Sequence, residues 1–311
     1  MDCVVAVDVG GTTIKGGLVA RDGTILHFER RDTPRGADRV IAAISAFVAD
    51  LSRPRPGLRP VAVGLAVPGL VTPTHAVFAA AFGWRDVPVS SFTDVDLPVA
   101  LGHDVRSAGE AELAYGAGGD DVLFLPIGTG IAGAVVLSGS LYGGAGGWAG
   151  QIGHTPVRPD GLACGCGQRG CLAAYASGGA IAARYRSGAV GDAVRNGSGA
   201  AAGDAVRHDS GATARDVVRL AAEGDVRAAE VWSSAVDALA LALATYTLLL
   251  DPARIVIGGG VSLAGDALLV PLRERLAGRL AFRRPPEVVA SSLGVDAGLL
   301  GAGLLGWRSA S

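Results

Sequence analysis

The stretch Val4–Val19, with the sequence VVAVDVGGTTIKGGLV, decides the fold class of this 311-residue chain. Val4–Val9 is rich in β-branched valine, and Ile14–Val19 resumes as a second strand. The residues between them, Gly10–Thr13, have the composition of a turn. The stretch therefore predicts a β-hairpin whose tip is built from glycine and threonine.

A second stretch repeats this plan further along the chain. Val122–Ile127 and Ala132–Leu137 are apolar strands that flank Gly128-Thr129-Gly130. Two regions that each open with a strand, a Gly/Thr turn and a strand indicate a duplicated unit. The chain is also longer than one hydrophobic core usually allows, since lobes of roughly 100 to 200 residues are typical. We predict an α/β fold of two lobes with a cleft between the copies.

The remaining elements set the predicted lobe boundaries. The N-terminal lobe is placed at residues 1–112, with a C-terminal helix at about 297–311 returning to it, and the C-terminal lobe at 113–296. The elements predicted from apolar spacing are helix 39–51, strand 61–67, strand 99–103, helix 107–115, helices 215–222 and 228–250, strand 254–257 and helix 298–307.

Residues 187–212 differ in composition from the rest of the C-terminal lobe. They are dominated by Gly, Ala, Ser and Asp, and the sequence GDAVR occurs twice, at Gly191 and at Gly203. Such composition favours a mobile surface insert or short broken helices. A lid over the substrate is the alternative.

Bulk composition argues against several classes of protein. The net charge is −2 and no Lys/Arg run occurs, so no nucleic-acid partner is expected. The longest apolar stretch, Ala238–Leu250, is too short to span a bilayer and predicts a buried helix. The N-terminus has neither the basic region nor the cleavage site of a secretory signal peptide. We therefore expect a cytoplasmic protein that does not bind a membrane.

Both glycine turns have the composition of a phosphate-binding loop. A phosphate tail needs many donors near a backbone that can approach it closely, and glycines permit that approach while Thr hydroxyls and amide N–H groups donate. Either turn alone also fits an ordinary hairpin, but their occurrence at the head of each lobe favours phosphate binding. Asp8, at the end of the first strand, is predicted to meet Mg²⁺ through water. The other predicted phosphate contacts are Gly10, Gly11, Thr12, Thr13, Lys15, Gly128, Thr129 and Gly130.

Asp104 is the candidate catalytic base. It lies where a predicted strand ends and a helix begins, which is where α/β sheets place ligand sites. In phosphoryl transfer a carboxylate accepts the proton of the attacking hydroxyl group. The alternative role, an N-cap of the following helix, is open for Asp104 alone. The two phosphate turns favour the base.

The pattern His154-x9-Cys164-x-Cys166-x4-Cys171 predicts a metal site. Four cysteines are too few for a disulfide framework in so long a chain, and three of them fall within this pattern. Glycines between them let the loop curl around one ion. Four protein ligands leave no position for water, so a structural Zn²⁺ is expected. Cys3 is predicted to be a small buried residue.

Taken together, these motifs resemble the ROK family of bacterial sugar kinases and sugar-responsive repressors, and its glucokinase branch in particular. The resemblance covers nearly the whole chain. Asp8–Thr12 and Ile127–Gly130 resemble the two phosphate motifs, and Ile152–Leu172 resembles the zinc signature. Pro68-Gly69 and Gly83-Trp84 resemble sugar-cleft loops.

The resemblance implies an actin-like (RNase H-like) fold that closes over ATP and a sugar, with Mg²⁺ and a structural Zn²⁺, and usually a homodimer. It implies phosphorylation of a sugar's terminal hydroxyl group, commonly O6. It implies contacts to the adenosine from Gly258, Gly259 and Gly260, and contacts to the sugar from Gly69, His103, Asp104, Gln151 and His154.

Three positions depart from the family pattern. The usual Asn before the catalytic Asp is His103, and the usual Glu residues are replaced by Gln151 and Ala173. Because buried polar groups discriminate strongly between sugars, these changes predict a preference for a sugar other than unmodified glucose. The alternatives are a glucokinase proper, an amino-sugar kinase acting on a 3-amino-3-deoxyglucose or an N-acylhexosamine, and an inactive sugar-binding homologue. Intact Asp104 and both phosphate turns weigh against the third.

Overall fold

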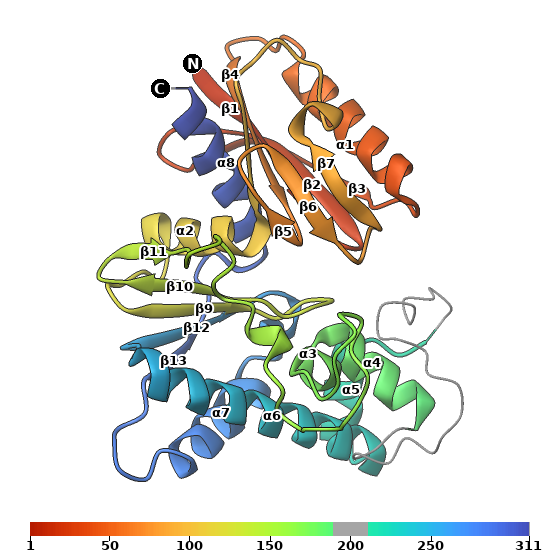
Figure 1. Ribbon diagram of the computed structural model, residues 1–311, viewed down its shortest axis with the longest axis vertical. Helices are drawn as coiled ribbons and strands as arrows, with labels where there is room; N and C mark the ends of the chain where they lie inside the picture. Colours follow the sequence, from red (N-terminus) through yellow and green to blue (C-terminus); the bar gives the residue numbers. More distant parts are fainter. Residues whose placement is uncertain (189–210, 311) are drawn as a thin grey trace. The chain divides into compact units, whose positions relative to one another are not determined.

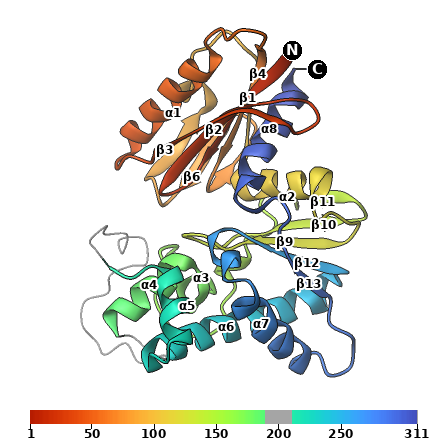
Figure 2. The same ribbon diagram turned by 180° about the vertical axis from the view of Figure 1, so that it is seen from behind.

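The computed structural model describes residues 1–188 and 211–310, and the chain divides into two compact units (Figures 1 and 2). The first unit comprises Met1–Gly118, Leu141–Ala149 and Ser292–Ser311, and the second comprises Gly119–Ser140 and Gly150–Ser291. Most of the predicted insert at 187–212 lies outside the described residues, and the lobe boundaries predicted above stay a prediction.

The first unit is built on a five-stranded sheet with the order β3-β2-β1-β4-β8. Strands β1 and β2 form the predicted antiparallel hairpin, with Val4 opposite Val19 and Val9 opposite Ile14. Strand β4 runs parallel to β1, and β8 runs parallel to β4. The strands are β1 (Asp2–Val9), β2 (Thr13–Val19), β3 (Ile25–Asp32), β4 (Arg59–Val67) and β8 (Val99–His103).

Successive residues of β1 point to opposite faces of the sheet, and the residues on both faces are apolar. A helix therefore covers each face. Val5 and Val7 belong to the core formed with α1 (Ala37–Ser52). Val4 and Ala6 belong to the core formed with α8 (Ala297–Ser309). The surfaces of α1 and α8 that pack against β1 are both apolar, which explains why this strand is an almost continuous run of apolar residues.

Helix α8 approaches the sheet closely because both surfaces carry glycines. A Cβ atom on Gly64 would lie 1.8 Å from the carbonyl oxygen of Ala302, and one on Gly301 would lie 2.1 Å from that of Ser107. Ser107 belongs to α2 (Asp104–Tyr115), so α8 packs against α2 as well as against the sheet. The first unit also holds a small sheet of β5 (Leu70–Val71), β6 (His75–Ala79) and β7 (Trp84–Pro88), with the turn η1 (Val89–Ser91).

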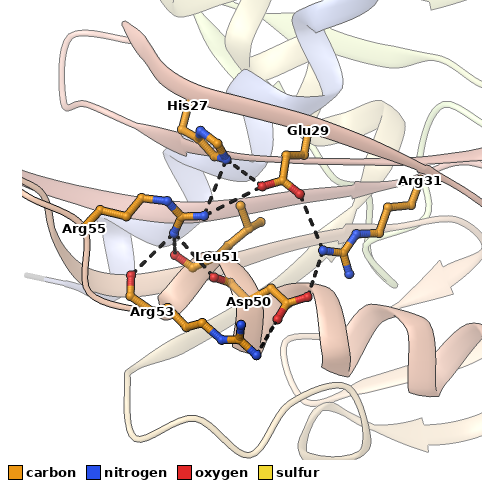
Figure 3. A network of polar contacts seen from close by, with 7 residues as sticks. All are labelled: His27, Glu29, Arg31, Asp50, Leu51, Arg53 and Arg55. Atoms are coloured by element: carbon orange, nitrogen blue, oxygen red, sulfur yellow. Dashed lines mark hydrogen bonds and ion pairs between the residues drawn. The ribbon is translucent and has the colours of Figure 1, made fainter.

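A polar network ties the edge strand β3 to the end of α1 (Figure 3). The Arg31 guanidinium contacts Asp50 at 2.9 Å and Glu29 at 3.5 Å. Arg55 donates to the carbonyl oxygen of Leu51 at 2.8 Å, and His27 lies 2.7 Å from Glu29. These pairs are partly exposed, so each adds little stability. Their charges do protect the open edge of the sheet from pairing with another chain.

The second five-stranded sheet repeats the strand plan of the first, with the order β11-β10-β9-β12-β13. The central strand β9 is antiparallel to β10 and parallel to β12, just as β1 is antiparallel to β2 and parallel to β4. The structure therefore confirms the predicted duplicated α/β plan. The strands are β9 (Val122–Pro126), β10 (Ala134–Leu137), β11 (Ser140–Tyr142), β12 (Arg254–Gly258) and β13 (Glu287–Ala290).

The core of the second unit is dominated by the long helix α6 (Val226–Leu250). Its length and composition would allow it to cross a membrane, but half of its most apolar window is buried inside the structure. The core helices of globular proteins also pass this test of length and composition, so the test alone does not assign a membrane span. The other described elements are η2 (Ile152–His154), α3 (Ala173–Ala176), α4 (Gly178–Ser187), α5 (Ala214–Ala222), η3 (Gly260–Ala264), α7 (Asp266–Gly278) and, in the first unit, η4 (Gly294–Asp296).

Candidate active site and metal site

Asp104 lies at the junction of β8 and α2, as predicted, but it is not the N-cap. The cap is His103, whose ring nitrogen Nδ1 accepts a hydrogen bond from the backbone N–H of Arg106 at 3.3 Å. Asp104 is the first helical residue, and its Oδ1 lies 3.5 Å from His103 Nε2. The His103 side chain is 10% exposed and that of Asp104 is 24% exposed. A capping role for Asp104 is therefore wrong, and its carboxylate is accessible to a ligand.

Asp8 and Lys15 face each other across the first hairpin. They are partners in the β1–β2 register, and Lys15 Nζ lies 3.7 Å from Asp8 Oδ2. Lys15 Nζ also donates to the carbonyl oxygen of Val295. Burial raises the pKa of Asp8 to about 6, with the Lys15 ammonium opposing this rise and the Asp104 charge adding to it. The two carboxylates thus sense each other's charge, which suits a site for a divalent cation.

The tip of this hairpin presents open backbone. Gly10 is required by geometry, because a Cβ atom there would lie 2.9 Å from the carbonyl oxygen of Thr13. Thr33 fixes Gly10 further by donating to its carbonyl oxygen at 2.7 Å. Gly11 and Thr12 are exposed, and a Cβ atom on Gly11 would meet nothing within 4 Å. The tip therefore leaves space beside its N–H groups for phosphate oxygens.

In the second unit the two predicted glycine turns are joined through Ile127. The N–H of Ile127 donates to the carbonyl oxygen of Gly258 at 2.9 Å, and its own carbonyl oxygen accepts from Val261 at 2.9 Å. Gly259 has φ 75°, and a Cβ atom there would lie 2.6 Å from the Ile127 carbonyl oxygen. Only glycine fits this position. The turns at 128–130 and 258–260 thus form one connected surface.

A third glycine segment joins this surface and was missed in the sequence. The N–H of Gly178, at the start of α4, donates to the carbonyl oxygen of Gly128 at 2.7 Å. A Cβ atom on Gly179 would lie 3.0 Å from the carbonyl oxygen of Thr129. The available signal was Ser177 followed by two glycines, because serine is a frequent N-cap, and the Ser177 hydroxyl group does accept from the backbone N–H of Ala180 here.

The four predicted metal ligands lie together in the second unit. One ligand atom from each of His154, Cys164, Cys166 and Cys171 falls within 4.8 Å of all the others. The Nδ1 atom of His154 lies 3.8 Å from the Cys164 sulfur, and the sulfurs of Cys166 and Cys171 are 3.8 Å apart.

The chemistry of this cluster fits a dication. Burial, followed by the charge of Cys164, raises the pKa of Cys171 to about 12, and burial lowers the pKa of His154. Three thiolates can share so small a volume only if a cation offsets their repulsion. Gly167 and Gly170, at φ 94° and 71°, provide the loop curvature that the sequence predicted.

The predicted sugar contacts are divided between the units. Gly69 and His103 belong to the first unit together with Asp104, while Gln151 and His154 belong to the second and flank η2. Gly69 has φ 102°, and a Cβ atom there would lie 2.1 Å from the carbonyl oxygen of Phe78. The predicted base and first phosphate turn therefore share one unit. The glycine surface at residues 128–130, 178–179 and 258–260 shares the other unit with the metal cluster.

Known proteins resemble this chain over nearly its whole length. A glucokinase of Thermotoga maritima is 36% identical over 310 residues, covering 96% of this chain and 95% of the relative. An N-acetylmannosamine kinase of Yersinia pseudotuberculosis is 31% identical, with 98% of each chain covered.

A solved structure agrees as well. The ROK family glucokinase of Streptomyces griseus in complex with glucose and AMPPNP has a TM-score of 0.82 and 31% identity, covering 98% of this chain and 99% of that one. The family model described as ROK matches residues 4–308. From these matches and the site described above, the chain belongs to the ROK family.

Proposed function

We propose that this protein is an ATP-dependent sugar kinase that phosphorylates the terminal C6 hydroxyl group of a hexose or hexose derivative. The observation that carries the proposal is the full-length likeness to a ROK glucokinase that binds glucose and AMPPNP. The glucokinase and N-acetylmannosamine kinase relatives support the same reaction class. The accessible carboxylate of Asp104 supports an active enzyme over an inactive sugar-binding homologue.

Asp104 is the proposed base that accepts the proton of the sugar hydroxyl group as its oxygen attacks the γ-phosphorus of ATP, while the bond from that phosphorus to the ADP oxygen breaks and ADP leaves. Asp8 would hold a Mg²⁺ ion through water, and Lys15 keeps that carboxylate in place through the ion pair at 3.7 Å. A bound Mg²⁺ would supply neutralisation of the phosphate charge. The hairpin tip at 10–13 and the turn at 128–130 donate backbone N–H groups to the phosphates, and the turn at 258–260 contacts the adenosine.

A structural Zn²⁺ is the second proposed metal. His154, Cys164, Cys166 and Cys171 would supply all four ligands that a structural Zn²⁺ takes, which would leave no position for a reacting water. The ion would fix the loop that follows Gln151 and thereby support the sugar contacts. From the family resemblance we add that the enzyme works as a homodimer in the cytoplasm.

For the substrate we propose a modified hexose over unmodified glucose. His103 is mostly buried and is fixed as the cap of α2, so its ring occupies a defined position beside Asp104. Because Nδ1 accepts from Arg106, a neutral His103 ring carries its proton on Nε2 and acts there as a donor. The amide oxygen of Gln151 can accept from an amine, which favours an amino-hexose such as 3-amino-3-deoxyglucose. Ala173, at the start of α3, offers no polar group in place of a carboxylate.

An ADP-release assay with ATP, Mg²⁺ and a sugar panel tests both parts. The panel contains glucose, its epimers, 3-amino-3-deoxyglucose, glucosamine and the N-acylhexosamines. ADP release with any of these sugars supports the kinase, and its absence with all of them contradicts it. The substrate proposal fails separately if kcat/KM for glucose equals or exceeds that of every modified sugar.

A further inference from the structure

Glu112 is a buried carboxylate that sequence analysis did not single out. It lies in the third turn of α2 and its residue is only 2% exposed. Carboxylates are rarely buried to this extent, because desolvation is costly unless hydrogen bonds replace the lost water. The free energy lost by burying this carboxylate must therefore be offset by the hydrogen bonds that it accepts.

Both oxygens of Glu112 accept hydrogen bonds from segments outside its own helix. Oε2 accepts from the backbone N–H of Ala117 at 2.8 Å and from the Ser292 hydroxyl group at 3.2 Å. Oε1 accepts from the backbone N–H of Leu293 at 3.1 Å. Gly116 makes room for this arrangement, since a Cβ atom there would lie 2.2 Å from Oε2. One side chain thus fastens α2 to the segment where the chain returns to the first unit.

The returning segment reaches Asp8 and Lys15 within a few residues. Val295, two residues after Leu293, provides the carbonyl oxygen that accepts from Lys15 Nζ. Gly298 lies directly against Asp8, because a Cβ atom on Gly298 would lie 2.3 Å from Oδ2 of that carboxylate. The position of residues 292–298 therefore determines where the Asp8–Lys15 pair sits.

The other end of the connection is Asp104, the first residue of α2. A helix transmits the position of one turn to the next, because each turn is bonded to the one before it. Fixing Glu112 therefore also limits how α2 and Asp104 can shift along the sheet.

We propose that Glu112 is a positioning residue for phosphoryl transfer: it holds the helix that carries Asp104 in register with the segment that supports Asp8 and Lys15. This inference rests on the kinase function proposed above. Glu112 is enclosed by α2, Ala117 and residues 292–293, so it is not assigned a contact to sugar or nucleotide. Its loss should slow the chemical step while leaving ligand binding intact, since a small misplacement of reacting groups reduces rate strongly.

Glu112→Gln is the informative substitution. It keeps the size of the side chain but replaces one acceptor oxygen by an N–H₂ group, which would face a backbone N–H of Ala117 or Leu293. Glu110→Gln is the matched control on the same helix. It removes the same charge and loses a contact to Arg308 of α8, yet its described bonds do not reach residues 292–298.

The experiment measures single-turnover rates, both KM values and the Kd for AMPPNP, with active sites counted by AMPPNP binding. Wild type is first assayed on the sugar panel, and its inactivity would contradict the kinase function itself. For active enzyme, we expect Glu112→Gln to lower the rate per site about 10-fold or more, with KM and Kd within about 3-fold of wild type. Glu110→Gln should stay within about 2-fold of wild type in every constant.

Two results would overturn the inference. One is a rate per counted site for Glu112→Gln that equals that of wild type, which would leave only a structural role. The other is an equal loss of rate in Glu110→Gln, which would show a general effect of charge on α2. If Glu112→Gln does not fold, Ser292→Ala decides, since it removes one of the three bonds. It should lower the rate about 2- to 5-fold with unchanged KM, and an unchanged rate contradicts the proposal.

Discussion

Replacing Asp8 by Asn should make the protein more stable at neutral pH and hardly change its stability in acid. Burial disfavours the charged form of Asp8 and raises its pKa from 3.8 to about 6. The Asn side chain has similar size and carries no charge. The buried negative charge is therefore removed at every pH at which wild type carries it.

The magnitude follows from the difference between the folded and unfolded pKa. Between pH 3.8 and about 6, the unfolded chain has lost this proton while the folded chain still binds it. The unfolding free energy of wild type, measured relative to that of Asp8→Asn, therefore falls as the pH rises from 3.8 to about 6. Above about pH 6 this difference no longer changes. A shift of about 2 units corresponds to about 3 kcal/mol at about 1.4 kcal/mol per unit.

Urea unfolding of the Mg²⁺-free and nucleotide-free proteins at a series of pH values between 4 and 7.5 measures this effect. The difference in unfolding free energy, Asp8→Asn minus wild type, should increase by about 2–3 kcal/mol from the acid end to the neutral end. Effects independent of pH, such as altered packing, add the same amount at each pH and cancel. A difference that stays constant across the series would refute the assignment of a high pKa to Asp8.

Three further experiments test the site and the fold. Asp104→Asn should lower turnover about 100-fold or more while AMPPNP still binds, and ADP release near the wild-type rate would remove Asp104 from the role of base. Elemental analysis should find about one zinc per chain in wild type and in the control Cys3→Ala, but none in Cys171→Ala. The melting temperature of Cys171→Ala should also fall. Zinc retained in Cys171→Ala would contradict the metal site. Gly64→Ala should reduce the free energy of unfolding by about 3 kcal/mol, because its methyl group meets the Ala302 carbonyl oxygen at 1.8 Å, whereas Gly11→Ala, with nothing within 4 Å, should change it little. Equal stability of these two glycine variants in chemical denaturation would contradict the close packing of α8.

Structural features that are formed by residues close together in the sequence could be predicted. Continuous apolar runs predict β1 and β9, because a strand buried on both faces needs apolar residues at successive positions. The cluster of His154 and three cysteines could be predicted because its members lie within one short loop, whose glycines allow the required curvature.

Features that join distant residues could not be predicted in the same way. Glu112 resembles any other acidic residue of a helix until its contacts with Ser292 and Leu293, about 180 residues away, are known. The capping role of His103 was missed for another reason, since serine, threonine, aspartate and asparagine are the usual caps and the sequence offered Asp104 next to it.

The placement of α8 has a consequence for synthesis of the protein on the ribosome. One face of the first sheet, which includes Val4 and Ala6, is covered by residues of the last helix, Ala297–Ser309. Translation proceeds from the N-terminus, so this apolar face cannot be covered until the residues up to about Ser309 have left the ribosome, roughly 300 residues after Val4 and Ala6. During that interval the face is a binding surface for chaperones that recognise apolar strands.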